Sequence, residues 1–324
     1  MTAAVPRPAA RAGDVAVPLS STRFRSTRFS TIPKGHSMLR IAVPNKGSLS
    51  EPASAMLHEA GYRQRKHSKE LVLTDPDNNV EFFFLRPRDI AIYVGSGRLD
   101  AGITGRDLLM DSGAEAEEIL QLGLAPATFR YAAPAPIARE LAEQGKKGLA
   151  GLRVASSYIG IVQRDFAEHG IEAAALVKLD GAVETAIQLG VADVIADVVE
   201  TGTTLAQAGL EVFGEPILRS EAVLIRRAGA ETSPALEQLV RRLQGVLVAR
   251  SYVMMDYDIR VERVEAAVTL TPGLESPTVS PLHNEGWVAV RAMVPRKNAQ
   301  QIMDDLWEIG ARAILVTGIH ACRL

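Results

Sequence analysis

A turn that mixes acidic, glycine and hydroxyl residues follows a strongly apolar segment in the middle of the chain. Residues 191–205 read VADVIADVVETGTTL, so an apolar strand leads into a small polar turn that opens a helix. Gly202 lets the backbone approach a phosphate closely, while the threonine hydroxyls and the helix N-terminus donate to its oxygens. Asp197 or Glu200 can accept hydrogen bonds from ribose hydroxyls. The combination predicts a phosphoribosyl site made by Asp197, Glu200, Thr201, Gly202, Thr203 and Thr204.

A helix start without any ligand is the alternative explanation of this turn, because Thr and Gly are common at helix N-termini. The turn is not a Walker A loop, since no Gly-Lys-Ser/Thr follows at the required spacing. The acid, the glycine and the hydroxyls occur together, which favours the phosphoribosyl interpretation.

Three further turns with basic or hydroxyl residues lie in the first half of the chain, each where an apolar run gives way to a helix. Lys46 lies in PNKGS (44–48), and TGRD occupies 104–107. At the carboxyl end of a strand and the positive end of a helix, such turns favour anions. Arg86 and Arg88 flank a proline and could clamp a phosphate or a carboxylate. A solvated turn lysine and surface ion pairs are the open alternatives.

Alternating strands and helices must position these turns. From Met38 onward the chain predicts α/β units with largely parallel sheets. The first helix is expected to have Ser48 or Ser50 as its cap and to stop at Gly61. A Pro/Ala-rich stretch, 126–136, is expected to be a connector or hinge. The expected strands are 39–43, 80–85, 99–103, 153–155 and 176–179, and the expected helices include one beginning at Leu108, one ending at Gly170 and one over 182–189.

Composition excludes several classes of protein. The chain has 324 residues, 47% of them hydrophobic, which suits two or more domains with large cores. It has no apolar run of the ~20 residues that a spanning helix needs, and its single cysteine, Cys322, cannot form an internal disulfide. We therefore expect neither a membrane protein nor a secreted one. A formal net charge of -2 gives no electrostatic reason to expect nucleic acid.

The first 37 residues differ from the rest of the chain. They hold six Lys or Arg residues and one acid, which makes this segment +5 and the remainder −7 within the total of -2. A segment so rich in Ala, Pro, Ser and Thr cannot bury enough apolar area to offset the entropy of ordering it, which predicts a disordered tail. Its Arg- and Ser-rich composition also fits an organellar transit peptide. A third interpretation is that the native chain begins at Met38, directly before the first expected strand.

Four segments together resemble one enzyme family. They are VPNKGSLSEP (43–52), RPRDIAIYVGSGRLDAGITGRDLL (86–109), DVVETGTTL (197–205) and LTPGLESPTVSPL (270–282). In this order they are similar to the long form of ATP phosphoribosyltransferase, the first enzyme of histidine biosynthesis. The resemblance runs from about residue 38 to the end of the chain and leaves only the N-terminal segment uncovered.

The resemblance implies an α/β, two-lobed catalytic part of the periplasmic-binding-protein type (type II), followed by an ACT-like regulatory domain. Lobe I would comprise residues 38–130 and 218–250, lobe II residues 131–217 with the phosphoribosyl pyrophosphate loop, and the regulatory domain residues 251–324. The C-terminal residues independently predict the order βαββαβ of a ferredoxin-like unit. The expected strands are 251–257, 278–282, 287–294 and 313–316, and the expected helices are 260–268 and 298–309.

The implied reaction joins ATP, through adenine N1, to C1 of 5-phosphoribosyl 1-pyrophosphate and releases pyrophosphate. The 201–204 turn is assigned to the 5-phosphate and Asp197, with Glu200, to the ribose. Lys46, Arg86 and Arg88 would meet pyrophosphate or triphosphate oxygens, Mg²⁺ would bridge them, and no side chain is expected to act as a general base. Lys46 and Arg88 thus belong to the phosphoribosyl pyrophosphate set, and the nucleotide set is Lys46, Gly47, Arg86, Thr104, Gly105, Asp107 and Tyr158. Ile159 stands where the family pattern has proline, which concerns the adenine side.

Feedback inhibition by histidine is a further implication of the resemblance. The ammonium group of histidine needs a carboxylate, for which Asp258 is the candidate, although Asp256 and Asp258 could simply be a solvated strand end. The pocket would be completed by Leu274, Ser276, Thr278 and Ala313. The resemblance also implies a homo-oligomer, a dimer or hexamer, and a cytoplasmic location, unless residues 1–37 direct the chain to an organelle.

Two other functions stay open from the residues alone. A two-lobed cleft could bind a solute without chemistry, although a secretory signal is not found and the C-terminal unit has no place in such a module. A phosphoribosyltransferase for another acceptor is the second possibility, because the turn at 197–204 does not identify the acceptor.

Overall fold

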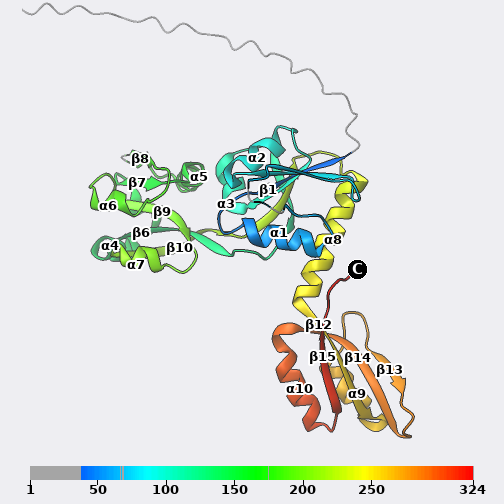
Figure 1. Ribbon diagram of the computed structural model, residues 1–324. Coiled ribbons are helices and arrows are strands. Elements are labelled where there is room, and N and C mark those ends of the chain that lie inside the picture. Colours follow the sequence, from blue (N-terminus) through cyan, green and yellow to red (C-terminus); the bar gives the residue numbers. More distant parts are fainter. Residues whose placement is uncertain (1–37, 66, 68, 174, 324) are drawn as a thin grey trace, which may run out of the picture. The chain divides into compact units, whose positions relative to one another are not determined.

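Three β-sheets organise this chain in the computed structural model, which describes residues 38–65, 67, 69–173 and 175–323 (Figure 1). The three interpretations of residues 1–37 therefore concern residues outside the described part. The first sheet has the order β2-β3-β1-β4-β11-β5, with the parallel pairs β3–β1 and β1–β4 at its centre. Its strands are β1 (Leu39–Pro44), β2 (Val72–Asp75), β3 (Val80–Leu85), β4 (Ala101–Gly105), β5 (Ala116–Gln121) and β11 (Ala222–Arg227).

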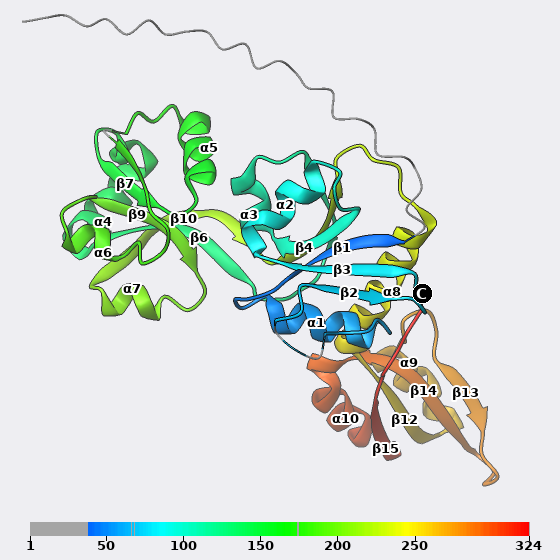
Figure 2. The ribbon, with the colours of Figure 1, turned by 45° about the horizontal axis from the view of Figure 1, so that its top comes forward.

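Helices cover both faces of this first sheet, as Figure 2 shows. On β1, Ile41 packs with α1 (Ser50–Glu59) and α8 (Pro234–Ser251), whereas its neighbour Ala42 packs with α2 (Pro87–Gly95). Successive strand residues point to opposite faces, so a strand covered on both sides is apolar throughout. Gly102 is required where α2 crosses β4, because a Cβ there would lie 2.5 Å from the side chain of Ile90.

The second sheet has the order β10-β6-β9-β7-β8. Its buried side chains pack with α4 and α5 on one face and with α6 and α7 on the other. The strands are β6 (Ala127–Pro134), β7 (Arg153–Ser156), β8 (Ala175–Lys178), β9 (Val194–Val199) and β10 (Leu210–Ser220). The helices are α4 (Ala135–Gln144), the 3₁₀ turn η1 (Gly145–Leu149), α5 (Ile159–His169), α6 (Thr185–Gln188) and α7 (Thr203–Gln207). Two α/β lobes are present, as expected.

Several local expectations are wrong. The sheets of the two lobes are mixed rather than largely parallel, because the strands that return between lobes, β10 and β11, pair antiparallel with their neighbours. The Pro/Ala-rich stretch at 126–136 does lead from the first sheet to the second, but most of it is strand β6. Neither serine caps α1, whose N-cap is Leu49 without a side-chain bond, although Gly61 follows its end as expected. Helix α3 (Arg106–Ser112) begins two residues before Leu108, and α6 is shorter than the expected helix at 182–189.

The C-terminal residues form the expected βαββαβ unit. Its sheet has the order β13-β14-β12-β15, and all three pairs are antiparallel. The elements are β12 (Tyr252–Arg260), η2 (Val261–Arg263), α9 (Val264–Leu270), β13 (Thr278–Pro281), β14 (Trp287–Pro295), η3 (Arg296–Asn298), α10 (Ala299–Glu308) and β15 (Arg312–Gly318). Met255, Tyr257 and Ile259 of β12 are buried in the core that α9 and α10 complete. Because residues alternate along a strand, Asp256 and Asp258 lie on the opposite face of the sheet.

Within the described ranges, the helices are all too short or too polar to pass through a membrane.

Candidate functional site

A cavity of about 200 Å³ is lined by turns from both lobes. These are the turns after β1 and β4 in the first sheet and after β7 and β9 in the second. Turns at the carboxyl ends of strands are the usual location of ligand sites in open α/β sheets. Six residues that the sequence singled out line this cavity: Lys46, Gly47, Gly105, Asp107, Tyr158 and Glu200.

The turn after β1 is fixed by backbone contacts. The Asn45 N–H donates to the carbonyl of Leu85, at 2.8 Å, which ties the end of β1 to the end of β3. Gly47 has a φ of +80°, a conformation that glycine adopts without strain, and its carbonyl accepts from Ser50 N–H at the start of α1. The Lys46 side chain is exposed and can reach an anion in the cavity.

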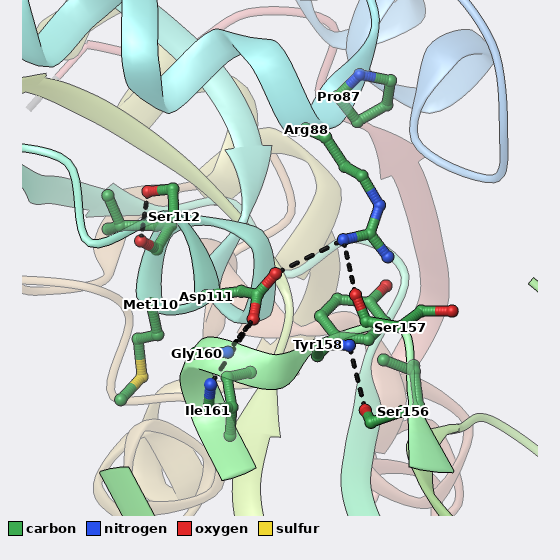
Figure 3. A network of polar contacts seen from close by, with 12 residues as sticks. Pro87, Arg88, Met110, Asp111, Ser112, Ser156, Ser157, Tyr158, Gly160 and Ile161 are labelled. Carbon is green, nitrogen blue, oxygen red and sulfur yellow. Dashed lines mark hydrogen bonds and ion pairs between the residues drawn. The ribbon is translucent and has the colours of Figure 1, made fainter. Parts of the chain in front are cut away.

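The two arginines of the RPRD turn occupy different positions. Arg86 is exposed at the N-cap position of α2 and is not among the described residues that line the cavity. The guanidinium of Arg88 lies 4.4 Å from the centre of the Tyr158 ring, which forms part of the cavity wall. Its Nη1 donates to the Ser157 carbonyl at 3.0 Å and to Asp111 Oδ2 at 3.3 Å (Figure 3). Arg88 therefore connects the two lobes at the edge of the cavity.

The end of β4 and the start of α3 contribute two buried polar groups. Thr104 is fully buried, and its hydroxyl donates to the Pro87 carbonyl at 2.9 Å, so it positions the start of α2. Asp107 faces the cavity and is held by Ser220, whose hydroxyl donates to Asp107 Oδ1 at 2.7 Å and accepts from Asp107 N–H at 3.0 Å. Gly105 leaves room for that carboxylate, because a Cβ there would overlap Asp107 Oδ1.

Tyr158 forms an aromatic wall of the cavity. Its ring meets Phe129 edge to face, with the ring centres 5.4 Å apart. Burial raises the pKa of the Tyr158 hydroxyl, and the charge of Asp107 raises it further, so the phenol stays neutral at physiological pH. The Tyr158 hydroxyl can therefore donate a hydrogen bond in this site and carries no negative charge.

The threonine turn after β9 is open to solvent. Gly202 has a φ of +75° and is the N-cap of α7, a conformation that glycine adopts without strain. The hydroxyls of Thr201 and Thr203 lie 3.1 Å apart, and these two residues and Thr204 are exposed. Glu200 brings this segment to the cavity wall, whereas the turn itself faces solvent.

Asp197 is partly buried near the end of β9. Its Oδ1 accepts from the Val198 N–H at 2.8 Å. Burial raises the pKa of Asp197, and the negative charges of Glu184 and Asp107 act in the same direction. A carboxylate whose pKa is raised by burial and by neighbouring negative charges is a candidate functional group.

Replacing Asp197 by asparagine is therefore expected to stabilise the ligand-free protein at neutral pH. A raised pKa in the folded state makes ionised Asp197 a cost above that pKa, and the cost is absent below the unfolded pKa of about 3.9. We expect Asp197→Asn to raise the free energy of unfolding by about 0.5–2 kcal/mol at pH 7.5 and by less at pH 4. Denaturant unfolding at the two pH values measures the difference.

Asp193→Asn is a control of opposite sign. Hydrogen bonds from Arg153 lower the pKa of Asp193, so its ionised form stabilises the fold above the unfolded pKa, and this contribution fades as the pH falls through the folded pKa. Asp193→Asn should lose stability at pH 7.5. A loss of stability in Asp197→Asn at that pH would contradict the prediction.

The histidine candidates are spread over the outer face of the C-terminal sheet. Asp258 pairs with Ala289 on one side and Arg312 on the other, and Ala313 follows at a register shift with a φ of +50°. Thr278 belongs to β13, which pairs with the edge of β14 that faces away from β12. The exposed residues Leu274 and Ser276 belong to the loop that precedes β13. One protomer thus groups Asp258 with Ala313, whereas Thr278 lies on the other side of β14 and Leu274 and Ser276 lie in the loop before β13.

One cluster of potential metal ligands occurs among the described residues, away from the cavity. Ligand atoms of Asp165, Glu168 and His169 lie within 4.8 Å of one another. Asp165 already accepts a hydrogen bond from Tyr131 Oη at 2.8 Å and forms an ion pair with Lys146. These partners explain the buried carboxylate without a metal.

Sequence reasoning missed two residues that hold the site together, Asp111 and Ser220. Ser220 contacts a residue 113 positions away, which no local pattern reveals. Asp111 did carry a signal. An acid in the last turn of a helix opposes the helix dipole, so a tertiary partner for Asp111 would offset this unfavourable position.

Known proteins resemble this chain over most of its length. A family model described as ATP phosphoribosyltransferase matches residues 86–245, and a model described as HisG, C-terminal domain, matches residues 249–321. An ATP phosphoribosyltransferase of Streptomyces avermitilis is 71% identical over 291 residues, which are 89% of this chain and 100% of the relative. The relative from Salinispora tropica is 61% identical over 288 residues, again 89% of this chain and 100% of the relative.

A solved structure shares the fold at lower identity. It is the ATP phosphoribosyl transferase (HisG:HisZ) complex from Thermotoga maritima, which is 24% identical to this chain with a TM-score of 0.55. The match covers 65% of this chain and 98% of that chain.

Proposed function

Because this chain belongs to the ATP phosphoribosyltransferase family, we propose that it catalyses the first step of histidine biosynthesis. The lone pair of adenine N1 of ATP forms a bond to C1 of 5-phosphoribosyl 1-pyrophosphate while the bond from C1 to the pyrophosphate oxygen breaks. Pyrophosphate leaves with that electron pair, and the product is N1-(5-phosphoribosyl)-ATP.

The observation that carries this proposal is the cavity between the lobes. Turns that are far apart in the sequence bring a lysine, a neutral tyrosine and the three carboxylates of Asp107, Glu200 and Glu221 to its wall. Cation and hydroxyl donors suit phosphate oxygens, and carboxylates suit ribose hydroxyls or a hydrated cation. The lysine and the phenol thus suit the phosphates, and the carboxylates suit the ribose or a cation that accompanies the phosphates.

Positioning and electrostatics account for the proposed catalysis. The threonine turn at 201–204 holds the 5-phosphate, and Asp197 with Glu200 orients the ribose. Lys46 and Arg88 stabilise the charge that develops on the leaving pyrophosphate. Adenine N1 has a free lone pair, so the transfer needs no general base.

Magnesium is the metal that this site suits. The carboxylates at the cavity wall are Asp107, Glu200 and Glu221, and Mg²⁺ prefers oxygen ligands from carboxylates together with substrate phosphates. When bound, the ion neutralises charge on the pyrophosphate oxygens. We expect chelation of Mg²⁺ by excess EDTA to abolish turnover and added Mg²⁺ to restore it.

The C-terminal domain serves the regulation of the enzyme by histidine. Free histidine binds the C-terminal domain through Asp258 and inhibits the reaction. The enzyme acts in the cytoplasm as a homo-oligomer, a dimer or a hexamer. The spread of the five histidine candidates within one protomer supports an oligomer in which a second protomer completes the histidine site.

Incubation with ATP, 5-phosphoribosyl 1-pyrophosphate and Mg²⁺ tests the proposed function. The adduct changes the adenine chromophore, so its formation is followed by absorbance and its mass by mass spectrometry. Turnover that requires both substrates, and falls when histidine is added, is the expected result. Binding of a substrate without turnover would favour a solute-binding module, and turnover with a different base would indicate another phosphoribosyltransferase.

A further inference from the structure

Asp111, in the last turn of α3, bridges the two lobes beside the cavity. Its Oδ1 accepts from the backbone N–H of Gly160 at 2.8 Å and of Ile161 at 3.4 Å, both in the first turn of α5. Its Oδ2 accepts from Arg88 Nη1 at 3.3 Å (Figure 3). One carboxylate from lobe I thus contacts an arginine of lobe I and a helix of lobe II.

This carboxylate replaces a cap that α5 does not provide for itself. The N-cap residue, Tyr158, makes no side-chain cap bond, and the first turn of a helix has N–H groups without intrahelical partners. A negative charge at that end stabilises α5, whereas the same charge at the end of α3 opposes the α3 dipole. Asp111 is therefore locally unfavourable in its own helix and is compensated by the other lobe.

The backbones of the two helices also approach closely. A Cβ on Gly160 would overlap the carbonyl oxygen of Asp111, so the contact requires glycine at this position. Arg164 of α5 donates to the carbonyl of Met110, the residue before Asp111. The spacing of the lobes at this edge of the cavity is therefore set by direct contacts.

Arg88 is oriented by the same contacts. Both hydrogen bonds found for Arg88 within the described residues come from Nη1, and its guanidinium lies against the Tyr158 ring. Nη2 and Nε make no hydrogen bond within the described residues, which leaves them available to a substrate oxygen beside Tyr158 at the edge of the cavity. The side chain of Asp111 is only 17% exposed, and its negative charge holds the Arg88 guanidinium in this orientation.

We infer that Asp111 is a positioning residue for the phosphoribosyl transfer. Through its Oδ2 it holds Arg88 against Tyr158, and through its Oδ1 it closes α5 onto α3, without touching a substrate itself. The inference rests on the proposed function, because the step that it serves is the departure of pyrophosphate. An interaction that strengthens as charge develops on the leaving group affects kcat more than KM.

Asp111→Asn separates the two roles of this side chain. Asparagine is as good a cap as aspartate, so its Oδ1 keeps the bonds to α5, whereas the charge that faces Arg88 is lost. We expect a melting temperature close to that of the wild type and a kcat reduced about 10-fold or more, with both KM values within about threefold. If Asp111 were only a helix cap, Asp111→Asn would keep the wild-type kcat.

A double-mutant cycle with Arg88→Ala completes the test. If Asp111 acts through Arg88, Asp111→Asn should lower kcat no further in the Arg88→Ala background, and fully additive losses would overturn the inference.

Glu117→Ala is the matched control, since it removes another carboxylate partner of an arginine in lobe I, at 2.8 Å from Arg226, and should leave kcat unchanged. Wild-type adduct formation is measured in the same assay. No adduct from the wild type would overturn the proposed function and the inference together, whereas a wild-type kcat in Asp111→Asn would overturn the inference alone.

Discussion

Replacing Thr203 and Thr204 together by alanine is expected to raise the KM for 5-phosphoribosyl 1-pyrophosphate by about 100-fold or more, with little change in kcat. Two hydroxyl donors to a charged phosphate contribute about 1.5–3 kcal/mol each, and about 3 kcal/mol already corresponds to a factor of more than 100. The 5-phosphate does not react, so it is held equally in the ground state and the transition state. A loss of uniform binding appears in KM.

The structure makes this double variant a clean experiment. Both side chains are exposed, and Gly202, which gives the turn its shape, is retained. Alanine is tolerated at the start of α7, so the fold should persist. The change in KM is measured at saturating ATP, and calorimetric binding of 5-phosphoribosyl 1-pyrophosphate to the ATP-free protein gives the same comparison at equilibrium.

Thr185→Ala is the matched control for this prediction. Thr185 is another exposed threonine of lobe II, and its hydroxyl donates to the Ala182 carbonyl at 2.7 Å. Its removal should leave the KM unchanged. An unaltered KM in the Thr203 and Thr204 double variant would remove the turn from the phosphate site.

The turns of the site could be predicted from sequence because their signals are local. A strand, a glycine and a helix start occur within a few residues, and Gly47 and Gly202 adopt the positive φ that such turns use. The βαββαβ order was predictable for the same reason, since each element has its own period of apolar residues. The predicted boundaries of these strands and helices therefore agree with the structure to within a few residues.

The contacts that join these turns could not be predicted in this way. Asp111 reaches Gly160 across 49 positions, and Ser220 reaches Asp107 across 113. The partners belong to different lobes or to strands that cross between lobes, so their distance depends on the closure of the whole catalytic part. The prediction of largely parallel sheets was wrong for a related reason. Nothing local in residues 126–136 indicates that this segment pairs antiparallel with β10.

Asp258→Ala is expected to remove inhibition at the histidine concentrations that inhibit the wild type, while turnover stays within about twofold of the wild type. An ammonium group loses a charge-assisted bond of about 1.5–3 kcal/mol, and the lost contact weakens histidine binding by roughly 10- to 150-fold. Asp258 lies in the C-terminal sheet on the face opposite the core, in a different domain from the cavity. Its loss therefore should not disturb the binding of either substrate.

Asp256→Ala separates a specific contact from a general loss of charge. Asp256 lies two residues earlier on the same face of β12, but its carboxylate is already paired with Arg291 at 2.6 Å. We expect this variant to keep its inhibition by histidine, because its carboxylate is committed to an arginine. Initial rates at increasing histidine concentration measure both variants. Equal loss of inhibition in the two variants would point to the negative charge of the sheet face as a whole, and unchanged inhibition in Asp258→Ala would remove Asp258 from the histidine site.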